Sequence, residues 1–116
     1  MAKVCLMFPG QGSQSVGMGK DIFENNNAAW DILKQAGEGI KEIIFDGPED
    51  ALKLTKWAQP AIFTASSAFF AALKSQIDMS KHSFVGAGHS LGEYSALCAA
   101  GFFDFEQGLE IVRARG

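Results

Sequence analysis

Residues 85–101 read VGAGHSLGEYSALCAAG and decide the fold, because they join an apolar strand to a helix through a glycine-flanked serine. Residues 88–92, GHSLG, fit the pattern G-x-S-x-G, in which the serine occupies a sharp turn between strand and helix. The glycine on each side lets the two elements approach without Cβ clashes. The turn is predicted to present the Ser90 hydroxyl at the C-terminal edge of the sheet. The start of the helix would aim the Leu91 N–H at a developing oxyanion.

Two simpler interpretations of this segment stay open on the residues alone. Serine is a favoured N-cap, so Ser90 in a glycine-rich turn could merely begin a helix. His89 is adjacent to Ser90, and neighbouring side chains on a tight turn point apart, which disfavours His89 as the base that activates the serine. His82, between a strand and a loop, is predicted to be solvated.

A second glycine-rich segment, FPGQGSQSVGMG at residues 8–19, follows the apolar run KVCLMF at residues 3–8. It fails the dinucleotide pattern G-x-G-x-x-G at Ser15, and it fails the P-loop pattern at Met18 and Gly19. A nucleotide-binding module is therefore disfavoured. Gln11 is instead a candidate donor to an oxyanion, because an uncharged amide stabilises negative charge without first pairing with a carboxylate. The plainer interpretation is a loop glutamine that faces water.

Arg115 lies four and three residues after the apolar Ile111 and Val112, on the same face of an expected helix over residues 105–115. A guanidinium on an apolar face is costly unless it meets an anion, and its planar fork suits a carboxylate. A cation that complements the C-terminus of a helix is an equal alternative. Arg113 is expected to point elsewhere, near Glu110, and to be solvated.

The remaining pattern predicts an α/β architecture with a parallel sheet. Residues 3–8 read as a buried strand and residues 83–88 as a second strand. Expected helices cover residues 20–36 with a stop at Gly37, a segment beginning near Pro48, and residues 91–100 ending at Gly101. A further strong helix is expected to begin with Pro60 at its first position. Asp104 with Gln107 predicts a capping box for the last helix.

Composition narrows the class of protein. The chain has 116 residues, 47% of them hydrophobic, and a net charge of −3, which argues against a nucleic-acid partner. No secretory signal or membrane-spanning segment is recognisable, so a cytoplasmic protein without a membrane partner is expected. Cys5 and Cys98 are expected to be buried free thiols. With two cysteines and two histidines outside any ligand spacing, no metal or other cofactor is expected.

Four segments together resemble the malonyl-CoA:acyl carrier protein transacylases of fatty acid synthesis. They are FPGQGSQSVGMG at residues 8–19, QPAIFT at 59–64, GHSLGEYSAL at 88–97 and VRARG at 112–116. They occur in the family's order and span the chain, so residues 1–116 are expected to form the N-terminal portion of the catalytic core. The resemblance implies an α/β-hydrolase-like parallel-sheet core, with the remaining core strands and an inserted ferredoxin-like subdomain absent from this chain.

The resemblance also implies a role for each matched residue. Ser90 would attack the thioester of malonyl-CoA, with the Gln11 and Leu91 backbone N–H groups as the oxyanion hole. Arg115 would bind the malonyl carboxylate, and Gln11 and His89 are further candidate substrate-binding residues. The phosphopantetheine thiol of acyl carrier protein would then take the malonyl group in a ping-pong reaction.

The family's general-base histidine would lie beyond residue 116, since neither His82 nor His89 matches it. A serine without its base is a weak nucleophile, so the 116 residues alone are expected to be inactive. The missing C-terminal part of the same enzyme is then a possible partner. A serine hydrolase or esterase, a polyketide-type acyltransferase domain and a non-catalytic docking fragment remain alternatives, and the choice between malonyl and methylmalonyl stays open.

Overall fold

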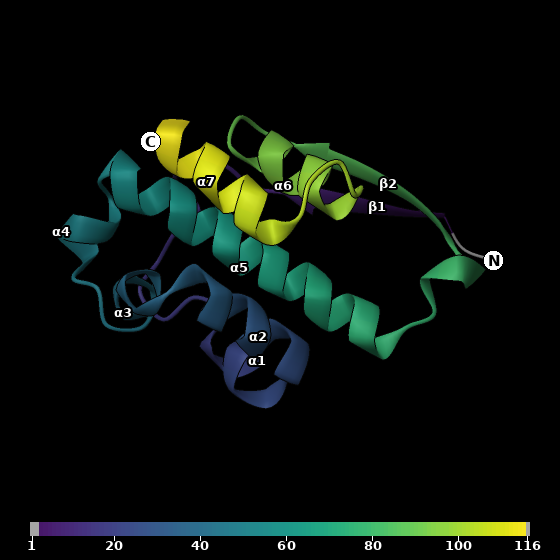
Figure 1. Cartoon of the computed structure of the whole chain (residues 1–116), viewed down its shortest axis with the longest axis horizontal. Helices are drawn as coiled ribbons and strands as arrows, with labels where there is room; N and C mark the ends of the chain where they lie inside the picture. The colour runs from purple at the N-terminus through teal and green to yellow at the C-terminus, as the bar shows by residue number, and fades with distance from the viewer. Residues whose placement is uncertain (1–2, 116) are drawn as a thin grey trace.

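The computed structural model describes residues 3–115, an α/β arrangement in which two strands lie at one edge of a group of helices (Figure 1). Gly116, the last residue of the VRARG segment, lies outside the described residues. In chain order the elements are β1 (Lys3–Phe8), α1 (Lys20–Asn25), α2 (Asn27–Ala36), α3 (Glu38–Phe45), α4 (Glu49–Leu52), α5 (Thr55–Gln76), the 3-10 turn η1 (Met79–Lys81), β2 (Ser83–Gly88), α6 (Gly92–Ala99) and α7 (Phe105–Arg115).

The sheet confirms both predicted strands and their parallel direction. β1 pairs with β2 in a register that runs from Lys3 opposite Ser83 to Phe8 opposite Gly88. Both strands therefore end at the same edge, and the glycine loop and the serine turn leave from adjacent points. Helix α6 packs on both strands.

The expectation that residues 3–8 form a buried strand is wrong for most of the strand. Phe8 is buried, whereas Cys5 and Met7 are exposed on one face together with Val85 of β2. The cause is the width of the sheet: two strands with α6 on one face leave the alternate side chains of the other face uncovered.

Helix α5 runs along the middle of the molecule, with α2 on one side and α6, α7 and the sheet on the other (Figure 1). The large side chains buried around it come from six helices and the serine turn; they include Phe23, Leu33, Ile40, Ile44, Leu52, Phe63, Leu91 and Val112. Phe63 of α5 stacks on Phe105 of α7 with ring centroids 5.5 Å apart. Leu91 belongs to this helical core and so anchors the serine turn to it.

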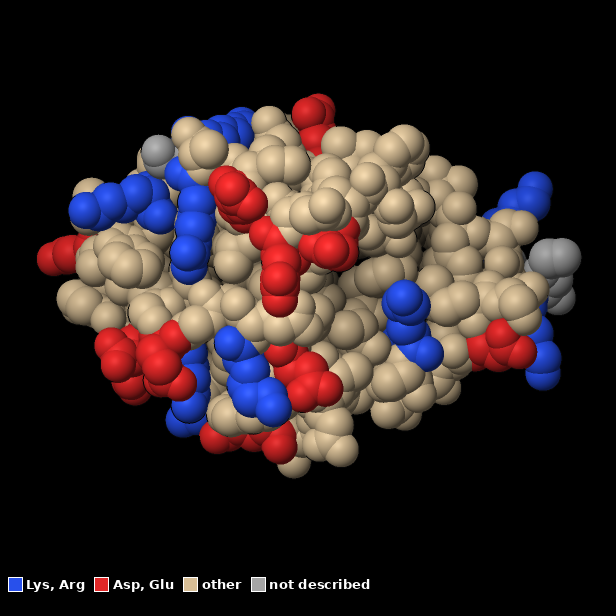
Figure 2. All heavy atoms as spheres, in the orientation of Figure 1, with Lys and Arg blue, Asp and Glu red and all other residues tan. Residues whose placement is uncertain are grey.

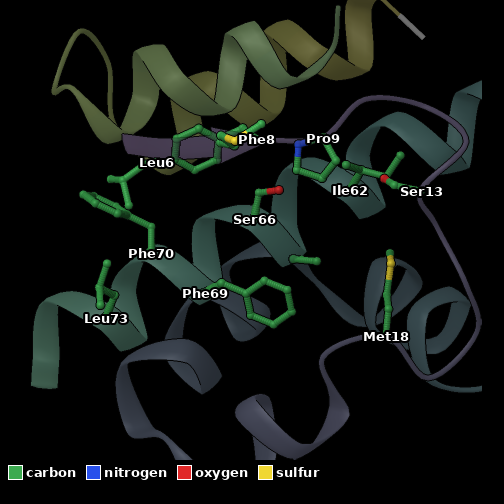
Figure 3. Close-up of a pocket in the computed structure, with 12 residues that line it drawn as sticks. Leu6, Phe8, Pro9, Ser13, Met18, Ile62, Ser66, Phe69, Phe70 and Leu73 are labelled. Atoms are coloured by element: carbon green, nitrogen blue, oxygen red, sulfur yellow. The ribbon is translucent and has the colours of Figure 1, made fainter. Parts of the chain in front are cut away.

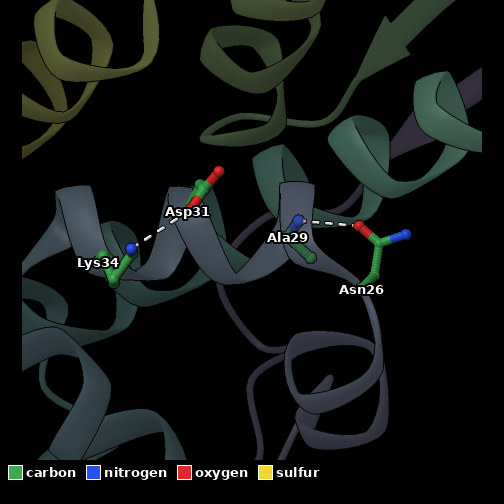
Figure 4. Close-up of polar contacts among 4 residues, drawn as sticks. All are labelled: Asn26, Ala29, Asp31 and Lys34. Carbon is green, nitrogen blue, oxygen red and sulfur yellow. Dashed lines mark hydrogen bonds and ion pairs between the residues drawn. The ribbon is translucent and has the colours of Figure 1, made fainter.

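Two predicted helix boundaries differ from the structure. The expected helix over residues 20–36 is broken at Asn26, whose backbone is extended and whose Oδ1 accepts a 3.0 Å hydrogen bond from the Ala29 N–H (Figure 4). Helix α5 begins at Thr55 rather than at Pro60, because packing of the surrounding apolar residues outweighs the single backbone hydrogen bond that Pro60 removes.

Helix α3 has no counterpart in the sequence prediction. It begins directly after Gly37 and buries Ile40, Ile43 and Ile44. By contrast, the predicted capping box of α7 is confirmed: the Gln107 N–H donates to Asp104 Oδ1 at 2.8 Å, and the Asp104 N–H donates to Gln107 Oε1 at 3.0 Å.

On the face shown in Figure 2, basic and acidic side chains interleave and no broad basic stripe is visible. The ion pair between Lys34 and Asp31, 3.5 Å apart within α2, is an example of this mixed surface (Figure 4). None of the helices within residues 3–115 is both long and apolar enough to cross a membrane.

Candidate active site

Ser90 stands at a strained turn between β2 and α6. Its φ of 55° makes it the one non-glycine residue with a positive φ among residues 3–115. The flanking backbone holds it there: the His89 N–H donates to the Phe8 carbonyl at 3.2 Å, and the Gly92 N–H donates to the His89 carbonyl at 3.0 Å. A side chain in this region of φ is unfavourable, so the turn is imposed by its surroundings.

Three glycines permit this turn because backbones cross at each of them. A Cβ on Gly92 would lie 2.0 Å from the Phe8 carbonyl oxygen, and one on Gly88 would lie 2.1 Å from the Gly92 oxygen. A Cβ on Gly10 would lie 2.4 Å from the His89 oxygen. The backbone of the glycine loop after β1 therefore contacts the backbone of the serine turn. The close approach of strand and helix that the glycines around Ser90 predict is confirmed.

The hydroxyl of Ser90 is engaged by an arginine rather than by a helix end. Arg115 Nη2 donates to Ser90 Oγ at 2.9 Å, and the guanidinium carbon lies 5.1 Å from the centre of the Tyr94 ring. Helix α6 has no side-chain capping hydrogen bond at its N-terminus. The alternative in which Ser90 is an ordinary N-cap is therefore wrong.

Arg113, two residues before Arg115 on α7, has a different partner from the one expected. Arg113 is exposed, as expected, and its Nη2 donates to the Ala36 carbonyl at 3.3 Å. Ala36 ends α2, where carbonyls lack helical partners and carry partial negative charge. Arg115 also lies in the last turn of α7, so the alternative in which it complements the C-terminus of a helix stays open.

Two backbone donors, one on the serine turn and one on the glycine loop that contacts it, have no hydrogen-bond partner in the described part of the chain. Within residues 3–115 no hydrogen bond engages the N–H of Leu91 or that of Gln11. The Leu91 side chain is fully buried, which fixes the first turn of α6 beneath the serine. Gln11 directly follows Gly10, which touches His89. The arrangement can therefore offer N–H groups from both the loop and the helix start.

The side chain of Gln11 is held by α5 rather than facing water alone. Gln11 Nε2 donates to Thr55 Oγ1 at 3.1 Å, and Gln59 Nε2 donates to Gln11 Oε1 at 3.4 Å. Sequence reasoning missed Thr55, and it missed Tyr94 beneath Arg115. Gln59 was visible only as part of the segment at residues 59–64.

The two histidines and the two cysteines lie in different surroundings from Ser90. His89 is exposed, and His82 is half-buried with its ring edge-on to Phe84, so His82 is less exposed to solvent than expected. Both thiols are free, but Cys5 is exposed and Cys98 is half-buried, whereas both were expected to be buried. Burial, and after it the Asp104 carboxylate, raises the pKa of the Cys98 thiol above its ordinary value. A raised pKa keeps more of the Cys98 sulfur in the unreactive thiol form.

Comparisons with known proteins show which family the chain resembles. The acyl transferase domain family matches residues 5–116 of the chain. The malonyl CoA-acyl carrier protein transacylase of Staphylococcus aureus (strain MSSA476) is 45% identical over 120 residues. That alignment covers 100% of this chain and 37% of the relative, so the chain spans little more than a third of the relative's length.

Solved structures show the same fold. The acyl-carrier-protein S-malonyltransferase of Bartonella henselae superposes with a TM-score of 0.90 at 42% identity, covering 99% of this chain and 38% of that one. A complex described as a type II PKS acyl-carrier protein with its malonyl-transacylase matches with a TM-score of 0.88 at 34% identity, again over 99% and 38%. The likeness is to the N-terminal part of these enzymes. The chain belongs to the acyl transferase domain family.

Proposed function

We propose that Ser90, Leu91, Gln11 and Arg115 form the acyl-accepting part of a malonyl transferase site. The complete enzyme would move a malonyl group from malonyl-CoA to the phosphopantetheine thiol of acyl carrier protein. The observation that carries the proposal is the 2.9 Å hydrogen bond between Arg115 Nη2 and Ser90 Oγ. It puts a permanent cation beside a strained serine.

The chemistry of a malonyl thioester matches that pair. Its reacting carbonyl and its free carboxylate are separated by a single methylene, so a nucleophile and a carboxylate-binding group must be near neighbours. A guanidinium stays charged at all relevant pH values and binds a carboxylate through two hydrogen bonds. An acetyl group has no such carboxylate, and Arg115 would therefore favour malonyl donors.

In the first step, Ser90 Oγ attacks the thioester carbon, loses its proton to a base, and coenzyme A leaves as the thiol. The Leu91 and Gln11 N–H groups would stabilise the oxyanion, since neither has another partner within residues 3–115. In the second step, the carrier thiol attacks the malonyl-serine ester and Ser90 regains its proton. The route uses no metal or other cofactor.

The base is proposed to be a histidine outside these 116 residues. His82 packs against Phe84, and His89 precedes Ser90 on the turn. The 116-residue chain alone is accordingly expected to show no robust turnover. The carrier protein as partner is supported by the names of the S. aureus relative and of the solved complex. A cytoplasmic location accords with that partner and stays part of the proposal.

A hybrid enzyme tests the proposal: residues 1–116 joined to the part of the S. aureus relative that the alignment leaves uncovered. Intact mass is measured after acid quenching of mixtures with malonyl-CoA and, separately, acetyl-CoA. We expect a malonyl adduct that is absent in Ser90→Ala, and little acetyl adduct. Thioester hydrolysis without transfer to a carrier thiol would indicate an esterase instead.

Arg113 supplies a matched control for the selector. Arg115→Ala is expected to reduce malonyl labelling and to bring the malonyl and acetyl rates together. Arg113→Ala, on the same helix but bonded to Ala36, should leave the ratio of the two rates unchanged. Equal ratios in both variants would remove Arg115 from its proposed role.

A further inference from the structure

The side chain of Gln11 is clamped at both of its polar atoms by one face of α5. Thr55 Oγ1 accepts from its Nε2 at 3.1 Å, and Gln59 Nε2 donates to its Oε1 at 3.4 Å. Residues 55 and 59 lie one helical turn apart and so share a face of the helix. A surface glutamine would otherwise sample many rotamers.

Gln59 adds an observation that stability does not explain. The residue is buried, with 7% of its surface exposed, and its Oε1 has no hydrogen-bond partner within residues 3–115. A buried acceptor without a partner is unfavourable and calls for an explanation. Its Nε2, directed at Gln11, offers one: the amide is kept for the hydrogen bond it donates.

The loop around Gln11 is fixed on its other side by the serine turn. Gly10 lies against the His89 carbonyl, where a Cβ would be 2.4 Å away. The Ser13 N–H and the Ser13 hydroxyl both donate to the Gly10 carbonyl, at 3.3 Å and 2.8 Å. The Gln11 side chain is therefore the link between this loop and the rigid helix α5.

We infer that Thr55 and Gln59 are positioning residues, which hold Gln11 so that its free backbone N–H is presented at a fixed place beside the serine turn. They touch neither the substrate nor the reacting atoms in this scheme, and they act through Gln11. The inference rests on the proposed function, because it assigns that N–H to the oxyanion of the acyl transfer.

Thr55 permits a matched pair of variants in the hybrid enzyme. Thr55→Val keeps the branched shape and removes the hydroxyl, whereas Thr55→Ser keeps the hydroxyl. Single-turnover acylation by malonyl-CoA is followed by acid quenching and intact mass. Removal of a whole oxyanion donor lowers such rates by about 10²–10³-fold. We expect Thr55→Val to lower the rate constant at saturation by about tenfold, with unchanged half-saturation, and Thr55→Ser to stay near the unsubstituted rate.

Gln59→Met separates positioning from stability. Methionine has a similar volume and removes the partnerless oxygen, so the thermal midpoint should not fall while the acylation rate constant does. A merely structural role would lower the midpoint and leave the rate constant of the folded protein unchanged. Unchanged rate constants in Thr55→Val and Gln59→Met, or equal slowing by Thr55→Ser, would overturn the inference.

Backbone amide resonances of the ¹⁵N-labelled 116-residue chain distinguish failure of this inference from failure of the proposed function. The Gln11 cross-peak should move in Thr55→Val and stay in Thr55→Ser. An unsubstituted hybrid that forms no adduct would contradict the proposed function, and the Gln11 resonance would still decide whether the clamp exists. An unmoved Gln11 cross-peak in Thr55→Val would overturn the clamp itself.

Discussion

The helical core and the sheet both contain large apolar side chains, but these side chains lie in opposite environments. Phe63 of α5 has none of its surface exposed, while Met7 of β1 is 82% exposed and Val85 of β2 is 65% exposed. The helices surround α5 on several sides, whereas the sheet is covered by α6 on one face. In this chain the helices carry most of the packing, and the serine turn lies at the ends of the strands.

The boundary between the two regions is marked by an apolar hollow of about 270 Å³ (Figure 3). Leu6 and Phe8 of β1 reach it from one side, and Phe70 and Leu73 of α5 reach it from the other. Parallel sheets are ordinarily buried on both faces. The sheet region thus contributes less to stability than its composition suggests, and substitutions should reveal that difference.

The largest expected effect comes from a pair of truncations, one in the helical core and one in the sheet. Phe63→Ala removes a ring stacked on Phe105 and should lower the free energy of unfolding by about 3–5 kcal/mol. Val85→Ala should change it by less than about 0.5 kcal/mol, because the side chain is mostly in water already. Urea unfolding followed by circular dichroism measures both. Comparable losses would show that the two regions are not as different as their burial indicates.

Gly92→Ala is expected to have the next largest effect, at the junction of the two regions. The new Cβ would collide with the Phe8 carbonyl and force the strand end and α6 apart, at a cost of about 2–3 kcal/mol. Gly39→Ala in α3 is the control, because its Cβ would meet Trp57 at an ordinary 3.7 Å and alanine favours a helix. Gly39→Ala should therefore be neutral or stabilising in the same unfolding experiment. Equal tolerance at both positions would refute the close crossing.

Because the backbone at Ser90 is strained, glycine at this position should give a more stable protein than alanine, the reverse of the order expected inside a helix. Both variants lack the hydroxyl, but only alanine keeps a Cβ at φ 55°, so Ser90→Gly should be more stable than Ser90→Ala by about 1 kcal/mol. Ser95, inside α6, should show the opposite order by a similar amount, since glycine is unfavourable in a helix. Thermal unfolding of the four variants gives the comparison. The same order at both positions would argue against strain at the serine turn.

The smallest predicted effect concerns the cap of α7, the helix that supplies Arg115. Asp104→Ala removes one half of the capping box and should lower the free energy of unfolding by about 0.5–1 kcal/mol. Asp104→Asn retains an acceptor and should recover most of that loss. If the two variants unfold alike, the charge of Asp104 rather than its hydrogen bond supports the helix.

The sequence was most informative where a few residues determine the backbone locally. Glycines at residues 88 and 92 around a serine predicted the strand–turn–helix unit, and both strands matched the structure. Asp104 and Gln107 predicted the start of α7 because a capping box needs only its own two residues. These features depend little on the rest of the molecule.

Features that depend on tertiary contacts were predicted less well. Pro60 appeared to begin a helix, yet packing of the buried segment around it extends α5 back to Thr55. The run Asn25–Asn26–Asn27 was a signal for the break between α1 and α2. The helical spacing of the apolar residues on both sides obscured that signal. The spacing of Ile40, Ile43 and Ile44 was an available signal for α3.

The candidate site shows the same division. Ser90 and Leu91 follow from the local motif, and the contact of Arg115 with the serine accords with the role that the resemblance gave it. Thr55 carries no motif, and it meets Gln11 only because α5 passes the glycine loop. Contacts between residues 44 positions apart cannot be read from periodicity.

Locating the acyl group tests the central claim most directly. The hybrid enzyme is mixed with malonyl-CoA, quenched in acid, digested with pepsin and mapped by tandem mass spectrometry. We expect one malonyl group, on Ser90 within the peptide that contains residues 88–92. A malonyl group on another serine or on Cys98, or no malonyl group on any peptide, would contradict it.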